Sequence, residues 1–182
     1  MESSRLPPPL DDLRVAQIAF LVPDLEVAVA RWSRMFGLTE WYALTYSTRS
    51  VPVLRYREEP GGFSMRLALA GAGPQIELIQ PLDGPSIYHE WIEEHGFGPH
   101  HVGVHVSSIE ATVDAMADAG IGAIQEGYGY GVRGDGGFAY FDTLDTYGVI
   151  VEAIEVPSLR QPSETLSHAG ITFTPSTGVR GR

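Results

Sequence analysis

Cysteine is absent from the 182-residue chain, and its absence removes three kinds of chemistry. No disulfide bond can staple the fold, no thiolate can hold a metal ion, and no cysteine can act as a nucleophile. A chain without cysteine is compatible with a reducing compartment, so the composition fits a protein of the cytosol.

Basic residues are scarce as well: the chain has 12 Lys and Arg against 23 Asp and Glu, which gives a net charge of -11. Such a charge repels nucleic acid and anionic membranes at long range. No apolar run approaches the length of a membrane span, and the first residues lack the basic and apolar regions of a secretion signal. The sequence therefore predicts a cytoplasmic protein whose partner is a small-molecule substrate, with no nucleic acid and no membrane.

Two stretches of the chain run in step when Gln17 is set against His101: QIAFLVPDLEVAV and HVGVHVSSIEATV. In this alignment Leu25 matches Ile109 and Glu26 matches Glu110, and each stretch has the pattern of a strand followed by a helix. The length suits one globular domain rather than two. We interpret the two halves as internal duplicates within one domain.

Short strands separated by glycine and proline turns complete each half, which gives the order β-α-β-β-β twice. The pattern predicts an α+β fold of two tandem βαβββ modules. The expected organisation is an extended N-terminal arm over 1–12, one domain over 13–156 (module one 13–84, a connecting helix 86–95, module two 99–156), and a C-terminal tail over 157–182 with one short strand, lying on the surface or on a partner subunit.

Each module contains two strands with one polar exception apiece: Gln17, Glu77, His101 and Glu152. Side chains alternate between the two faces of a strand, so each of these points away from its apolar neighbours. A lone Glu or Gln in a strand is more often a surface residue, but these four occupy equivalent places in duplicated halves. Two carboxylates, an imidazole and an amide oxygen make a candidate ligand set for a divalent metal.

The paired modules, the GFGPHHVGVHV segment and the closing YFDTLDTYGVIVEAIE resemble the vicinal oxygen chelate superfamily over residues 14–156. That superfamily contains glyoxalase I, methylmalonyl-CoA epimerase, extradiol dioxygenases and antibiotic-binding proteins. The resemblance is strongest to the epimerase-like branch, although epimerases usually carry His where this chain has Gln17. It implies a cupped, barrel-like mixed sheet with helices outside, a homodimer, and one divalent ion of zinc, nickel, cobalt, manganese or iron on Gln17, Glu77, His101 and Glu152.

A metal ion at such a site can polarise a carbonyl, and a nearby carboxylate can then remove the neighbouring proton. Glu152 and Glu77 are the catalytic candidates, as base and acid. We expect an isomerase, epimerase or lyase that acts on a small acyl-thioester or hydroxy-carbonyl compound. The alternatives are a lactoylglutathione-lyase-like enzyme, a non-catalytic antibiotic-type binding protein and an extradiol-type dioxygenase, and Gln17 and Glu77 argue against the last.

Four further residues are candidates for the substrate pocket. His105 shares the strand face of His101, and Tyr140 lies on a later strand. The glycine-rich stretch 126–137 predicts either a flexible lid or an ordinary long hairpin, from which Tyr130 and Arg133 would close over the substrate. Arg133 would then pair with a carboxylate or a phosphate.

Overall fold

The computed structural model describes residues 14–176, so the arm predicted over 1–12 lies outside the described residues. The described part contains twelve strands and four helices, and the predicted α+β class is confirmed. In chain order the elements are β1 (Val15–Leu21), α1 (Leu25–Phe36), β2 (Glu40–Tyr46), β3 (Val53–Tyr56), β4 (Glu59–Pro60), β5 (Met65–Ala70), β6 (Gln75–Pro81), α2 (Ile87–His95), β7 (Gly98–His105), α3 (Ile109–Asp118), β8 (Ala123–Tyr130), β9 (Gly136–Phe141), α4 (Leu144–Tyr147), β10 (Ile150–Glu155), β11 (Leu166–His168) and β12 (Ile171–Pro175).

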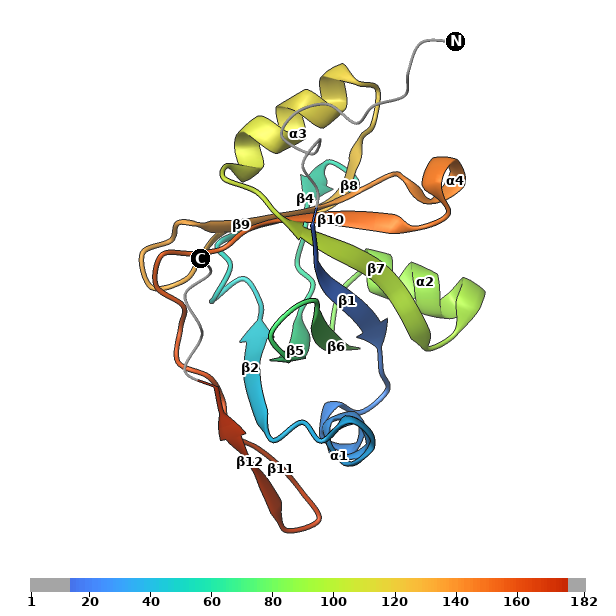
Figure 1. The fold of residues 1–182 in the computed structure, drawn as a ribbon. Coiled ribbons are helices and arrows are strands. Elements are labelled where there is room, and N and C mark those ends of the chain that lie inside the picture. Colours follow the sequence, from blue (N-terminus) through green and yellow to red (C-terminus); the bar gives the residue numbers. More distant parts are fainter. Residues whose placement is uncertain (1–13, 177–182) are drawn as a thin grey trace.

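The sheet has the order β11-β12-β2-β5-β6-β1-β7-β10-β9-β8-β3-β4, and no pairing joins its two ends. The predicted barrel-like sheet is therefore open. Figure 1 shows α1 and α3 at opposite ends of the molecule, each beside its own half of the sheet. Under α1 lies one apolar core and under α3 another, while a third core fills the space between the halves.

The two halves meet where β1 pairs antiparallel with β7, and the register there is symmetric. Gln17 is opposite Gly103, and Ala19 is opposite His101. In each half the first strand is parallel to the last, so that Ala19 also pairs with Glu77 and Gly103 with Glu152. A local twofold axis thus relates the halves, and the register confirms the internal duplication.

Both outer edges of the paired halves are covered by added strands. The strand predicted from VPVLRYR in module one is β3, and it pairs with β8 of module two. At the other edge β12 runs parallel to β2. The C-terminal segment is thus more than the predicted surface tail, because Leu166 and Phe173 of its hairpin are buried against the core under α1.

Helices α1 and α3 begin in the same way, as their duplicated sequences predict. The side chain of Asp24 accepts a hydrogen bond from the backbone N–H of Val27 at 2.8 Å, and Ser108 accepts one from Ala111 at 3.3 Å. These side chains satisfy N–H groups that have no partner within the helix. α1 ends at Gly37 in the left-handed conformation that glycine favours.

A second bond ties each helix to the last strand of its module. The N–H of Leu25 donates to Gln80 Oε1 at 3.2 Å, and the N–H of Ile109 donates to Glu155 Oε2 at 2.8 Å. Gln80 and Glu155 each lie three residues after the polar exception of their strand, Glu77 or Glu152. The helix start therefore fixes the strand that carries the carboxylate.

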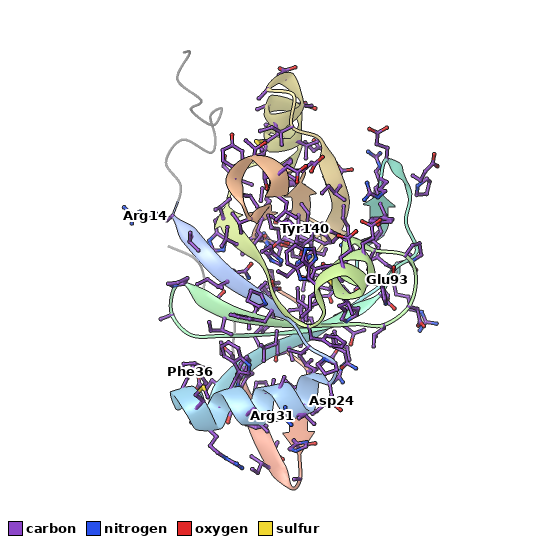
Figure 2. All side chains as sticks on the ribbon, turned by 90° about the vertical axis from the view of Figure 1, so that its right-hand side faces the viewer. Arg14, Asp24, Arg31, Phe36, Glu93 and Tyr140 are labelled. Carbon is purple, nitrogen blue, oxygen red and sulfur yellow. The ribbon has the colours of Figure 1, made fainter. Side chains whose placement is uncertain are left out.

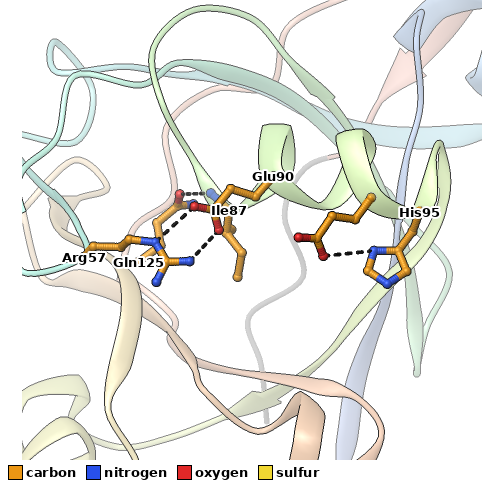
Figure 3. A network of polar contacts seen from close by, with 6 residues as sticks. Arg57, Ile87, Glu90, His95 and Gln125 are labelled. Carbon is orange, nitrogen blue, oxygen red and sulfur yellow. Dashed lines mark hydrogen bonds and ion pairs between the residues drawn. The ribbon is translucent and has the colours of Figure 1, made fainter.

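Helix α2 is attached to module two and to the β3–β4 hairpin (Figure 3). The buried side chain of Gln125 in β8 accepts a hydrogen bond from the N–H of Ile87 at 3.0 Å. Glu90 accepts two bonds from Arg57, at 3.0 and 2.7 Å, although both side chains are exposed. No helix in the described part is long and apolar enough to cross a membrane.

Candidate metal centre

The four polar exceptions come together in the interior because their strands are neighbours in the order β6-β1-β7-β10. Gln17, Glu77, His101 and Glu152 are only 4%, 5%, 2% and 5% exposed. The symmetric register at β1 and β7 brings one carboxylate from each half to the same place. We call these four residues the polar cluster.

Within the polar cluster the donor atoms converge on one point. His101 Nε2 lies 3.3 Å from Glu77 Oε2 and 3.0 Å from Glu152 Oε2, and one ligand atom from each of these three residues lies within 4.8 Å of the others. Beyond their contacts with one another these three atoms have no partner among the described residues, and Gln17 Oε1 has none either. Buried polar atoms normally have their hydrogen-bonding capacity satisfied, so this set of atoms fits a bound ion.

The charged groups of the polar cluster shift one another's pKa values. Burial lowers the pKa of His101, but the carboxylates of Glu152 and Glu77 outweigh it and raise that pKa to about 9. Burial also raises the pKa of Glu77, against the hydrogen-bonding influence of His101 and together with the charge of Glu152. The imidazole therefore holds a proton at neutral pH in the metal-free protein.

His100 orients the imidazole of His101 from behind. Their Nδ1 atoms are 2.9 Å apart, and burial keeps the pKa of His100 well below its usual value. With His100 neutral, the N–H at Nδ1 of His101 donates to Nδ1 of His100, which turns Nε2 toward Glu77 and Glu152. A ligating histidine needs such a partner on its second nitrogen.

The chemistry of this donor set fits a divalent ion. Imidazole nitrogen and carboxylate oxygen suit zinc, iron, nickel and manganese, and the amide oxygen of Gln17 adds a neutral ligand. Two carboxylates neutralise a charge of two, which removes the cost of burying them. With one imidazole, the polar cluster differs from the site of two histidines and one carboxylate that is typical of non-haem iron oxygenases.

A cavity opens onto the polar cluster and is walled by aromatic and aliphatic side chains. Gln17, Glu77 and Glu152 lie on its surface together with the predicted pocket residues Tyr130 and Tyr140. Its free volume of about 40 Å³ is enough for about three water molecules.

Tyr140 forms part of the cavity wall nearest the polar cluster. Its ring is 4.9 Å from that of His101, and its hydroxyl accepts a hydrogen bond from Tyr88 of α2 at 2.9 Å. Figure 2 labels Tyr140 near the middle of the molecule. Burial, and then the charge of Glu152, hold the pKa of Tyr140 well above its usual value, so the hydroxyl keeps its proton for donation.

The other two predicted pocket residues do not line this cavity. His105 is the last residue of β7 and is exposed, and Arg133 is exposed in the tight turn between β8 and β9. The predicted lid over 126–137 is instead a hairpin, because β8 continues to Tyr130 and β9 starts at Gly136. The cationic side chain on the cavity wall is Arg160, which no periodic pattern in the sequence indicated.

Comparison with known proteins places these features in context. The profile of the glyoxalase/bleomycin resistance protein/dioxygenase superfamily matches residues 16–141. No curated protein matches the chain. Methylmalonyl-CoA epimerase from Mycobacterium tuberculosis has a similar structure, with a TM-score of 0.56, 20% identity, and coverage of 86% of this chain and 94% of that one.

Two further solved structures have a similar fold. An epimerase variant from Streptomyces coelicolor, in complex with 2-nitronate-propionyl-CoA, has a TM-score of 0.55 and 19% identity, covering 80% of this chain and 98% of that one. A hypothetical protein from Bacillus halodurans has a TM-score of 0.57 and 20% identity, covering 82% and 99%. At these identities the likeness shows the fold.

Proposed function

The chain belongs to the glyoxalase/bleomycin resistance protein/dioxygenase superfamily, and on that premise we propose that it is a metal-dependent enzyme of the glyoxalase and epimerase type. Its reaction would be the removal of a proton next to a carbonyl, leading to epimerisation or isomerisation. The proposed substrate is a small acyl-thioester or hydroxy-carbonyl compound. The methylmalonyl-CoA epimerases among the similar structures support this class of substrate.

One observation carries the proposal: buried ligand atoms of Glu77, His101 and Glu152 lie within 4.8 Å of one another, beside a cavity that Gln17 also lines. A protein that only binds an apolar ligand has no need to bury two carboxylates, which is costly without compensation. Gln17, Glu77, His101 and Glu152 would hold the ion. When bound, the divalent ion supplies Lewis acidity toward a substrate oxygen.

The residues of the polar cluster divide the proton chemistry between them. Glu152 is the proposed base. Glu77, which belongs to the other half of the sheet, is the proposed acid that returns a proton to the substrate. Tyr140 would donate its hydroxyl proton to a substrate oxygen, and His100 would keep His101 turned toward the site.

Deuterium uptake at the substrate α-carbon tests this proposal. Protein supplied with zinc, nickel, cobalt, manganese or iron would be incubated in D2O with panels of acyl-CoA esters and hemithioacetals. We expect uptake with at least one compound, and a loss of about a hundredfold or more in Glu152→Gln. Glu94→Gln is the matched control, because the Glu94 side chain is 76% exposed.

The outcome also separates the alternatives. Metal binding without uptake on either panel would contradict the proton-transfer chemistry and leave a small-molecule binding protein. Formation of lactoylglutathione from the hemithioacetal would identify a glyoxalase, and oxygen uptake with catechols would identify a dioxygenase. The homodimer stays a prediction, which sedimentation of the purified chain would test.

A further inference from the structure

A segment beyond the family match crosses the cavity. Residues 157–164, which we call the strap, follow β10 and connect module two to the C-terminal hairpin. At its first end Leu159 O accepts a hydrogen bond from the N–H of Val132 at 2.9 Å, and Ser158 N–H donates to Asp135 Oδ2 at 3.1 Å. The strap is thereby tied to the β8–β9 turn of module two.

The other end of the strap is tied to β2 of module one. Tyr42 donates its hydroxyl proton to Gln161 O at 2.7 Å, and the N–H of Ala43 donates to Ser163 Oγ at 3.0 Å. The N–H of Glu164 then donates to Ala43 O at 2.8 Å. Because it is anchored on both modules, the strap holds the residue in its middle, Arg160, at a fixed place on the cavity wall.

Arg160 is the cationic side chain of that wall, at which no Lys or other Arg is found among the described residues. Its guanidinium carbon lies 5.1 Å from the centre of the Tyr42 ring, a contact that orients the group without neutralising it. No carboxylate of the described residues forms an ion pair with Arg160. A half-buried guanidinium with free donors is a ready partner for an anion.

We propose that the strap and Arg160 form an anion subsite on the wall of the cavity that Gln17, Glu77 and Glu152 also line, and that the substrate is a small carbonyl compound with a remote carboxylate. The carbonyl part of this inference rests on the proposed function. The free volume of about 40 Å³ suits a carboxylate. A single guanidinium carries one positive charge, which matches the single negative charge of a carboxylate better than the charge of nearly two on a phosphate.

Calorimetric titration with levulinate tests the subsite, because two methylene groups separate the carbonyl of this keto acid from its carboxylate. Its amide is a neutral match of the same shape, and inorganic phosphate is the third probe. We expect levulinate to bind about tenfold more tightly than the amide, as a charged hydrogen bond in a half-buried site would give. Arg160→Gln should remove this preference, and Arg133→Gln, on the exposed turn, should keep it.

Both metal-free and zinc-loaded protein would be titrated, so that the two proposals can fail separately. A preference that depends on Arg160 in both forms supports the subsite even if no metal-dependent reaction is found. An equal preference in wild type and Arg160→Gln overturns the subsite while leaving the metal centre untouched. Absence of levulinate binding overturns it as well. Tighter binding of phosphate than of levulinate overturns the assignment to a carboxylate. Arg160→Lys keeps the charge, and retention of the preference there supports a charge-based role.

Discussion

The two halves of the sheet offer the same backbone positions to the polar cluster but fill them with different chemistry. Module one supplies the neutral amide Gln17 where module two supplies the imidazole His101. The residues that tie the last strand of each module to its helix differ in the same way: Gln80 in module one is neutral, and Glu155 in module two is ionisable. The scaffold thus fixes where each polar side chain lies, and the sequence decides which half carries the imidazole.

The largest expected effect comes from removing the imidazole of module two. His101→Ala should weaken zinc binding by about a hundredfold or more, because the imidazole is the nitrogen ligand of the set. Metal content by elemental analysis and competition with a chelator would measure the loss. The matched control is His105→Ala on the same strand, which is exposed. A His101→Ala protein that still holds one ion per chain would refute the assignment.

The stability of the metal-free protein should depend on pH because His101 can be charged, whereas Gln17 at the equivalent position cannot. The pKa of His101 is raised to about 9, so the stability that its charged form contributes is complete below pH 6.5 and is lost as pH rises through 9. We expect the free energy of unfolding to fall by up to about 3 kcal/mol over that window. Urea denaturation of wild type and His101→Gln would test this, because parallel pH curves for the two proteins would contradict it.

Gly103 and Ala19 hold equivalent positions two residues after the ligands of their strands. A methyl group on Gly103 would lie 2.8 Å from Gln17 Oε1 and 2.9 Å from Ile154 Cδ1, whereas Ala19 is already packed in the central core. Gly103→Ala should displace Gln17, weaken zinc binding by about tenfold and cost about 1–3 kcal/mol of stability. Ala19→Gly should cost about 1 kcal/mol and leave the metal affinity unchanged. Equal zinc affinities in the two variants would show that Gln17 does not ligate.

The smallest expected effect comes from making module one resemble module two. Gln17→His would place an imidazole on each side of the local twofold axis. We expect zinc binding to tighten by about threefold, because imidazole is a better zinc ligand than an amide oxygen. Isothermal titration with zinc would measure this. Weaker binding in Gln17→His than in Gln17→Ala would mean that the site has no room for a second ring.

The sequence carries most of the information on the polar cluster. The alternation of period two and the duplicated strand order match Gln17 with His101 and Glu77 with Glu152. The structure brings ligand atoms of Glu77, His101 and Glu152 within 4.8 Å of one another. The helix start at Asp24 could be predicted because the N-cap is local chemistry. Such features depend on neighbours in the chain.

Features that depend on distant partners could not be predicted. β3 pairs with the two-residue β4 in its own module and with β8 of the other module, and no local pattern in VPVLRYR encodes the pairing with β8. Arg160 lies in a segment without periodicity, where only the bonds to β2 and to the β8–β9 turn decide its place. The glycines of 126–137 suggested a lid, but Gly127 is required because a side chain there would collide with the ring of Phe138.

The short strands at the two ends of the sheet limit how this protein can associate with itself. A strand without a partner offers its N–H and C=O groups to any extended chain, which leads to aggregation. Here the last strand at one end, β4, is Glu59–Pro60, two residues with a proline that has no N–H, and at the other end β11 has three. The edge of the longer strand β2, which carries the buried Trp41, Tyr42 and Leu44, is covered by β12 at Glu40 and Trp41 and by the strap at Ala43. A chain shortened before the strap would expose this apolar strand as a template for fibrous growth.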